Sequence, residues 1–198
     1  MSSENKIGVV ILAAGASTRL GKPKQLLRYH GKSLLQNAID AAVSSAANTV
    51  LIVLGANADE ITNEIDRSGI SIIINTEWNE GMASSVTIGL NELLFISPSI
   101  EAAIFMVCDQ PHISSQLING LINVHRQTGK PIVTCNYGDT IGPPALFHRT
   151  LFNEIMQLKG DVGARMIIQQ HSDEVATVLF PEGKIDIDTI DDYEALNS

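Results

Sequence analysis

Short apolar runs alternate along this chain with stretches of helical periodicity, and this alternation constrains the fold more than any other feature of the sequence. The runs are largely apolar on both faces, which is typical of strands buried inside a parallel sheet. They lie at residues 7–12, 50–54, 70–74, 102–108, 131–135 and 175–180.

Between these runs, apolar residues recur at steps of three and four, which predicts amphipathic helices. The apolar stripes cover residues 34–46, 86–94 and 117–124. Strands that alternate with helices predict an α/β fold with three layers, in which helices cover both faces of a mostly parallel sheet. In such sheets, ligands bind beyond the carboxyl ends of the strands, so the loops that follow Leu12, Asn75 and Cys108 are the candidate binding loops.

The length and charge of the chain exclude several classes of function. A chain of 198 residues is typical of a single domain, here residues 1–198. The 13 Lys and Arg against 22 Asp and Glu give a formal net charge of −9, which argues against binding to nucleic acid or to an anionic membrane. We find neither an apolar run long enough to span a membrane nor a secretory signal. The two cysteines cannot form a disulfide framework, so we expect a cytoplasmic protein.

The first candidate loop, residues 12–24, combines glycines with cations. Its small residues let main-chain N–H groups approach a ligand closely, and Arg19, Lys22 and Lys24 add positive charge. An Arg guanidinium holds phosphate through two hydrogen bonds, and a Lys ammonium acts as a mobile point charge. The segment therefore predicts a polyphosphate site; the alternative is a plain glycine turn whose cations are solvated.

Two familiar phosphate loops do not fit this segment. A Walker A loop has four residues between its glycines, whereas five separate Gly15 from Gly21, and Pro23 replaces the magnesium-binding hydroxyl. A dinucleotide fingerprint needs a second glycine two residues after the first, where this chain has Ser17.

The pattern Leu12-Ala-Ala-Gly-x-x-x-Arg19-x-Gly21-x-x-Lys24 resembles the signature of the MobA-like nucleotidyltransferases. That resemblance implies a Rossmann-like fold of the nucleotide-diphospho-sugar transferase type and transfer of a nucleoside monophosphate from an NTP to a phosphorylated acceptor. It gives Arg19 and Lys24 catalytic roles on the triphosphate. The residues that it places close to the nucleotide are Leu12, Ala13, Ala14 and Gly15.

The second loop, residues 75–85, is similar to the corresponding loop of the molybdenum cofactor cytidylyltransferases, the MocA branch. The resemblance adds Gly81, Ser84 and Ser85 to the nucleotide-binding residues, because hydroxyls and free N–H groups at a helix start can meet a ligand. Plain helix capping is the alternative for either serine. Trp78 in the same loop has two interpretations, stacking on a ring or packing in the core.

Later segments extend the resemblance to this branch. Cys108-Asp-Gln-Pro111 resembles its metal motif, and residues 142–144 and 160–165 resemble its acceptor side. They imply acceptor contacts by Pro144, Asp161 and Arg165; the alternative for Arg165 is an ion pair with Asp161, four residues earlier on one helix face.

The Leu-Ala-Ala-Gly form of the first loop resembles the cytidine-using branch of the family, whereas guanylyl-transferring relatives usually have a second glycine there, so the resemblance implies CTP over GTP. Pro23-Lys-Gln25 also resembles the methylerythritol-phosphate cytidylyltransferases, but those carry a different metal loop.

Two carboxylates are candidate ligands for Mg²⁺, which prefers oxygen. Asp109 follows a buried run and should project from a strand end; simple loop capping is its alternative. Residues 185–189 alternate like a strand, which would place Asp186 and Asp188 on one side. The resemblance gives the second ligand to Asp188, with Asp186 as substitute, although Ile190 and Asp191 depart from the family pattern.

The resemblance thus implies a cytidylyltransferase that moves CMP from CTP to the phosphate of the molybdopterin cofactor and releases pyrophosphate. Asp109 joins Arg19 and Lys24 as a catalytic residue, and the implied partners are CTP, the molybdopterin cofactor and a client molybdenum hydroxylase. The alternatives are a non-catalytic molybdenum cofactor carrier, or transfer to methylerythritol phosphate or a sugar phosphate.

Overall fold

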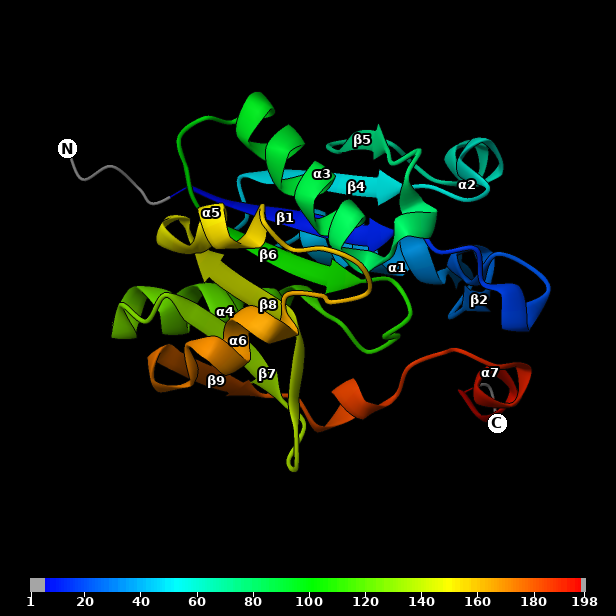
Figure 1. Ribbon diagram of the computed structural model, residues 1–198. Helices are drawn as coiled ribbons and strands as arrows, with labels where there is room; N and C mark the ends of the chain where they lie inside the picture. The colour runs from blue at the N-terminus through cyan, green and yellow to red at the C-terminus, as the bar shows by residue number, and fades with distance from the viewer. Residues whose placement is uncertain (1–5, 197–198) are drawn as a thin grey trace.

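A seven-stranded sheet forms the centre of the computed structural model, which describes residues 6–196 (Figure 1). Four parallel strands occupy one half, and an antiparallel strand joins them to the other half. From edge to edge the strands are β5 (Ser71–Ile74), β4 (Thr49–Leu54), β1 (Lys6–Ala13), β6 (Ile100–Val107), β8 (Ile141–His148), β7 (Ile132–Asn136) and β9 (Val175–Leu179). All six strands predicted from the apolar runs are present, and the prediction of a mostly parallel sheet is confirmed.

Strand β8 is the one member of the sheet that the apolar runs did not predict. It pairs antiparallel with both β6 and β7, and it begins with the Ile-Gly-Pro-Pro segment of residues 141–144. Proline and glycine are depleted in strands, so the start of β8 resembles a loop in sequence. Only its second half is continuously buried.

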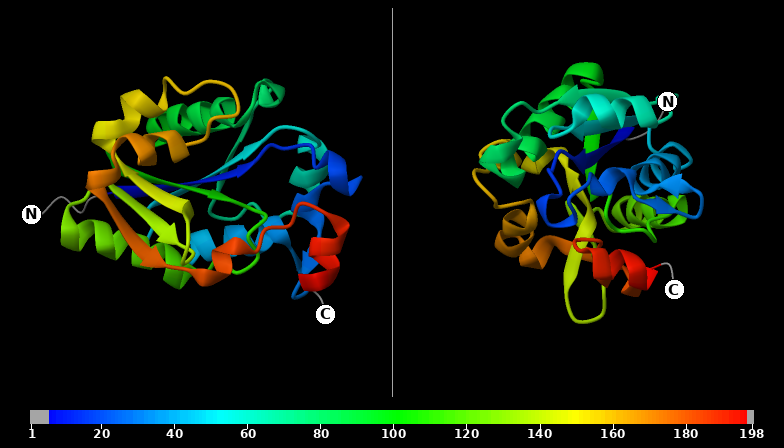
Figure 2. Two further views of the ribbon diagram at one scale, coloured as in Figure 1. Left: turned by 60° about the horizontal axis from the view of Figure 1, so that its bottom comes forward. Right: turned by 90° about the vertical axis from the view of Figure 1, so that its right-hand side faces the viewer.

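Helices cover both faces of the sheet, as Figure 2 shows edge-on, which confirms the predicted three layers. One face packs against α1 (Leu34–Val43), α2 (Ala58–Glu64) and α4 (Ser115–Thr128). The other packs against α3 (Met82–Ile96), α5 (Phe152–Ile155) and α6 (Arg165–Gln170). No helix in the described range is long and apolar enough to cross a membrane.

Successive side chains of β1 point to opposite faces of the sheet and pack against different helix layers. Val9 and Ile11 point into the core beneath α1, whereas Val10 points into the core beneath α3. Helix α3 lies very close to the sheet, because a Cβ on Gly89 would come within 2.7 Å of the Val10 side chain. Helix α1 begins where predicted, because the Ser33 hydroxyl accepts a hydrogen bond from the Gln36 N–H.

Residues 185–189 do not form a strand, so that prediction was wrong. The segment follows the 3-10 helix η6 (Pro181–Lys184) as extended chain without a ladder partner and leads into α7 (Ile190–Leu196). Its alternation still has a structural meaning: Ile187 is fully buried against Leu20, Leu27 and Leu34. The Tyr193 hydroxyl donates to the Arg28 carbonyl at 2.8 Å and so joins α7 to the hairpin of β2 (Arg28–Tyr29) and β3 (Lys32–Ser33).

Five further 3-10 turns lie in the connections. They are η1 (Thr18–Leu20), η2 (Lys24–Leu26), η3 (Trp78–Glu80), η4 (Arg149–Leu151) and η5 (Ser172–Glu174).

Candidate active site

A cavity of about 620 Å³ opens at the carboxyl ends of β1 and β6. The candidate binding loops that follow Leu12 and Cys108 contribute to its walls. We call it the cleft. Its size is typical of a small-molecule site. Most of the predicted nucleotide and catalytic residues line it together with Asp161: Leu12, Ala13, Ala14, Gly15, Arg19, Lys24, Gly81, Ser85 and Asp109. Ser84, Pro144 and Arg165 do not line it, and neither do the two candidates for the second metal ligand, Asp186 and Asp188.

The first loop keeps its shape through one buried polar side chain, Gln25. This residue is 1% exposed, and its amide nitrogen donates to the carbonyls of Ala13 at 2.8 Å and Gly15 at 2.9 Å. The Ser17 hydroxyl accepts a hydrogen bond from the Lys24 N–H at 3.0 Å, and Ser17 itself has a positive φ of 54°. These hydrogen bonds fold the loop back onto its own start.

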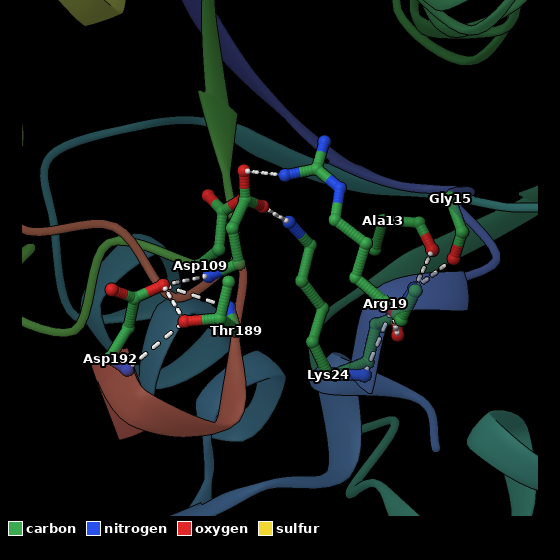
Figure 3. A network of polar contacts seen from close by, with 10 residues as sticks. Ala13, Gly15, Arg19, Lys24, Asp109, Thr189 and Asp192 are labelled. Carbon is green, nitrogen blue, oxygen red and sulfur yellow. Dashed lines mark hydrogen bonds and ion pairs between the residues drawn. The ribbon is translucent and has the colours of Figure 1, made fainter. Parts of the chain in front are cut away.

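Four charged side chains meet at one end of the cleft (Figure 3). The Lys24 ammonium lies 2.5 Å from Asp109 Oδ2 and 2.9 Å from Asp188 Oδ1. The Arg19 guanidinium reaches the other oxygen of Asp188 at 3.4 Å. The side chains of Lys24 and Asp109 are only 18% and 16% exposed, whereas Asp188 is 43% exposed. The structure therefore brings the two predicted cations and the two predicted metal ligands into one cluster.

Burial and the neighbouring charges together shift the pKa values of Lys24 and Asp186. Burial disfavours the charged form of Lys24, but Asp109 and Asp188 overcome this effect and raise the pKa of the ammonium above its ordinary value. Burial raises the pKa of the Asp186 carboxyl, and the negative charges of Asp109 and Asp188 raise it further. Three carboxylates thus lie close enough to repel one another, and two cations compensate them.

Two carboxylates, those of Asp109 and Asp188, could hold a divalent cation, although residues 6–196 contain no group of three or more His, Cys, Asp and Glu side chains placed to do so. Asp109 Oδ1 is buried and has no hydrogen-bond partner among the described residues, so one oxygen of this carboxylate is free for a further ligand. The backbone of Asp109 is held in place by its neighbours. The residue follows strand β6, and its carbonyl accepts a hydrogen bond from the Ile187 N–H at 3.1 Å. That bond holds the segment with Asp186 and Asp188 next to Asp109. An oxygen-only set of carboxylates suits Mg²⁺ or Mn²⁺ better than zinc.

Gly81 is required by the packing of the second loop. It has a φ of 107°, and a Cβ at this position would lie 2.5 Å from the backbone of Gly160. Ser85 is buried on the cleft side and accepts a hydrogen bond from the Asn75 amide at 3.0 Å. Ser84 instead donates to the Gly81 carbonyl at 2.8 Å and borders a neighbouring depression. It is not a helix cap, because Gly81 is the N-cap residue of α3 and no side chain of the described residues caps this helix.

The acceptor-side residues are divided between two cavities. Asp161 lines the cleft, whereas Arg165 lines a second cavity of about 300 Å³ beside it, which we call the apolar pocket. Pro144 is buried within β8, and it is Pro143 that lines this pocket. The alternative of a helical ion pair was wrong: Asp161 precedes α6, which begins at Arg165, and no ion pair joins the two within residues 6–196.

Three residues of the site had no role predicted from the sequence, and a fourth, Trp78, had two alternative ones. Gln25 and Ser17 shape the first loop, and Asn79 lines the cleft. Trp78 also lines the cleft and is 36% exposed, which favours the stacking interpretation over the core. Trp78 stands out in the sequence as the only tryptophan, but this does not indicate where its side chain points. Gln25 lies between Lys24 and Leu26 and has no feature in the sequence that marks it as buried.

Comparisons with known proteins agree with this geometry. The family model described as "MobA-like NTP transferase domain" matches residues 9–175. The nicotine blue oxidoreductase of Paenarthrobacter nicotinovorans is 32% identical over 81% of this chain and 80% of its own length. The purine catabolism protein PucB of Bacillus subtilis strain 168 is 26% identical over 98% of this chain and 95% of its own.

Solved structures support the same assignment. The crystal structure of Rv0371c from Mycobacterium tuberculosis H37Rv matches with a TM-score of 0.83 and 28% identity over 98% of each chain. The same mycobacterial protein is also known as a complex with manganese, which matches with a TM-score of 0.81. The fold and the family expected from the sequence are therefore confirmed. The chain belongs to the MobA-like NTP transferase family, a family of nucleotidyltransferases.

Proposed function

We propose that this protein transfers CMP from CTP to the phosphate of the molybdopterin cofactor and releases pyrophosphate. One observation carries the proposal: Arg19 and Lys24 of the glycine loop face the carboxylates of Asp109 and Asp188 at one end of the cleft. A site of this kind can hold a polyphosphate between cations on one side and a carboxylate-bound cation on the other. The choice of CTP and of the pterin acceptor rests on the resemblance of the two loops and the acceptor-side segments.

In the reaction, an oxygen of the acceptor phosphate attacks the α-phosphorus of CTP. The bond from that phosphorus to the bridging oxygen breaks, and pyrophosphate leaves with the bonding electron pair. The acceptor needs no general base, because a phosphate monoester is already an anionic nucleophile. Catalysis therefore depends on positioning and on charge neutralisation.

The residues of the cleft divide these tasks. The main chain around Gly15, held by Gln25, would receive the triphosphate, and Arg19 would pair with its oxygens. Lys24 would turn from Asp109 toward the phosphates, since its flexible stem allows its charge to follow the developing negative charge. Asp109 and Asp188 would hold Mg²⁺. When bound, Mg²⁺ supplies further neutralisation of the phosphate charge.

Pyrophosphate release tests the proposal directly. The purified protein is incubated with Mg²⁺, molybdopterin and each NTP in separate reactions, and we expect release with CTP. Release with GTP but not with CTP would overturn the cytidine assignment. Release that requires a sugar phosphate or methylerythritol phosphate instead of molybdopterin would replace the proposed acceptor.

Asp109→Ala tests the metal role within the same assay. The variant should lose turnover and keep its fold, because Asp109 supplies the buried ligand oxygen. Asp173→Ala is the matched control, since Asp173 is exposed on η5, outside the cleft. An active Asp109→Ala variant would remove this residue from the metal site.

The relative named as an oxidoreductase makes oxidation–reduction a second candidate. The cluster of Arg19, Lys24 and Asp109 favours the transferase, because neither an oxidoreductase nor a pure cofactor carrier needs a carboxylate that faces phosphate-binding cations. Failure to release pyrophosphate from any NTP with any of these acceptors would overturn the transferase.

A further inference from the structure

The two carboxylates that face Lys24 belong to segments that the fold holds in different ways. Asp109 directly follows β6, which lies inside the sheet between β1 and β8. Asp188 belongs to residues 185–189, which are extended chain without a ladder partner within residues 6–196. The sheet therefore fixes the position of Asp109 but not that of Asp188.

A small apolar cluster, which we call the tail core, holds the second segment. Its buried residues are Leu20, Leu27, Leu34 and Ile187. Tyr193 and Leu196 of α7 pack against them, and in Figure 1 this helix lies below β2, apart from the sheet. Ile187 is completely buried, although Asp186 before it is exposed and Asp188 after it is only partly covered. One apolar side chain between two carboxylates thus connects this segment to the tail core.

The tail core also contains residues next to the two cations of the site. Leu20 directly follows Arg19, and Leu27 directly follows η2, which begins at Lys24. The Leu27 carbonyl accepts a hydrogen bond from the Leu34 N–H at 2.8 Å, which joins this stretch to the start of α1. The cations and Asp188 are therefore placed relative to one another by the same apolar cluster.

The backbone of Ile187 connects the tail core to the first carboxylate. Its N–H donates to the Asp109 carbonyl at 3.1 Å. With Ile187 in this position, the Asp188 carboxylate reaches the Lys24 ammonium at 2.9 Å and the Arg19 guanidinium at 3.4 Å. A displacement of Ile187 would therefore displace Asp188 from Asp109 and from both cations.

Two other contacts of the tail do not fix Asp188 relative to Asp109. The Asp192 carboxylate accepts hydrogen bonds from the N–H groups of Asp188 and Thr189, but these bonds lie within the tail itself. The Tyr193 hydroxyl joins α7 to the hairpin of β2 and β3, not to β6.

We propose that Ile187 is a positioning residue, whose burial in the tail core places the Asp188 carboxylate where it and Asp109 can hold one divalent cation together. This inference rests on the proposed transferase function and adds to it the side chain that prepares the site for the cation. A second carboxylate that is already in place strengthens binding, because less conformational freedom is lost when the cation binds. Removing a residue that orients a metal ligand typically weakens metal binding by about 10- to 100-fold.

Mn²⁺ binding without nucleotide tests the inference, with free Mn²⁺ measured by electron paramagnetic resonance. Ile187→Ala removes the buried side chain and keeps every charged group, and we expect its affinity for Mn²⁺ to fall about tenfold. Ile187→Val keeps most of the buried side chain and should bind Mn²⁺ within about threefold of the wild type.

Ile100→Ala is the matched control, because Ile100 is also completely buried but lies at the end of β6 opposite to the cleft. It should leave Mn²⁺ affinity unchanged even if it lowers the thermal midpoint as much as Ile187→Ala does. Hydrogen exchange gives a second readout: amides of residues 185–189 should exchange faster in Ile187→Ala but not in Ile100→Ala.

Leu34→Ala opens the tail core from the side of α1 and should also weaken Mn²⁺ binding, so it decides the test if Ile187→Ala does not fold. Unchanged Mn²⁺ affinity in the folded variant, an equal loss of affinity in Ile100→Ala, or a wild-type protein that binds no Mn²⁺ would overturn the inference.

The positioning role and the transferase fail separately. Pyrophosphate release with CTP and molybdopterin, together with unchanged Mn²⁺ affinity in Ile187→Ala, would overturn only the positioning role. Weaker Mn²⁺ binding by Ile187→Ala, together with no pyrophosphate release by the wild-type protein, would overturn only the transferase.

Discussion

Lys24→Met replaces the ammonium between two carboxylates by an uncharged side chain of similar length. In the wild-type protein this ammonium is 2.5 Å from Asp109 and 2.9 Å from Asp188. In the variant, neither side-chain oxygen of Asp109 keeps a hydrogen-bond partner among the described residues, because Oδ1 already lacks one and Oδ2 loses Lys24. Removing one partner of a buried ion pair costs about 3–5 kcal/mol, and we take the lower end because both side chains keep some solvent contact.

We therefore expect the free energy of unfolding of the metal-free variant to fall by about 3 kcal/mol. For a chain of this size, that loss lowers the thermal midpoint by roughly 6–12 °C. Urea and thermal unfolding in the presence of a chelator measure it. Lys22→Met is the matched control, because Lys22 is exposed and its ammonium lies over the ring of Tyr193, 5.6 Å from the centroid, away from Asp109 and Asp188. It should cost less than about 1 kcal/mol.

A divalent cation should then reverse the effect. If Asp109 and Asp188 hold the metal as proposed, Mn²⁺ would have to compete with the Lys24 ammonium for them in the wild-type protein, and the variant removes this competitor. We expect Mn²⁺, without nucleotide, to bind the variant on the order of tenfold more tightly and to raise its midpoint more. The reasoning fails if the variant is as stable as the wild type in chelator, or if Mn²⁺ stabilises both proteins equally.

Three other perturbations probe the loop, the second carboxylate and a distant histidine. Gln25→Leu should lower stability by about 2 kcal/mol, because it leaves two first-loop carbonyls unpaired, and should raise the KM for nucleotide more than it lowers kcat; an unchanged KM would contradict the positioning role. Asp188→Asn should reduce turnover more than Asp186→Asn, and the reverse order would exchange their roles. A hydrogen bond to Glu154 raises the pKa of His171, so its stabilisation is complete below about pH 6.5 and is lost as the pH rises through the raised value. Urea unfolding of His171→Gln should therefore differ most from wild type near pH 6 and match it near pH 9; a constant difference would refute the linkage.

The buried strands and the meeting of the two charge groups were predictable from the sequence, for one physical reason. Strands β1 and β6 are parallel neighbours, so residues that follow their carboxyl ends must meet. This rule brings Arg19 and Lys24, which follow β1, to Asp109, which follows β6. To apply this rule, only the two apolar runs that form β1 and β6 have to be identified. The detailed path of the loops that follow them is not needed.

Features that depend on side-chain direction or on strand partners could not be predicted in this way. Ser84 and Ser85 are adjacent, yet only Ser85 lines the cleft, because successive residues of a helix point in different directions. Residues 185–189 have the alternation of a strand but no neighbouring strand to pair with. The amide of Gln25 bonds carbonyls ten and twelve residues earlier, a contact that has no periodic signal in the sequence.

The charge balance of the cluster argues that nucleotide and divalent cation bind together. Arg19 and Lys24 are already paired with Asp109 and Asp188, and Asp186 adds a third carboxyl whose pKa is raised by the other two. A triphosphate alone would bring several negative charges next to these carboxylates in a chain whose net charge is −9. A divalent cation alone would have to displace Lys24. If both bound together, the cation would neutralise the carboxylates and Lys24 could turn to the phosphates. Each ligand would then remove the repulsion that opposes the other.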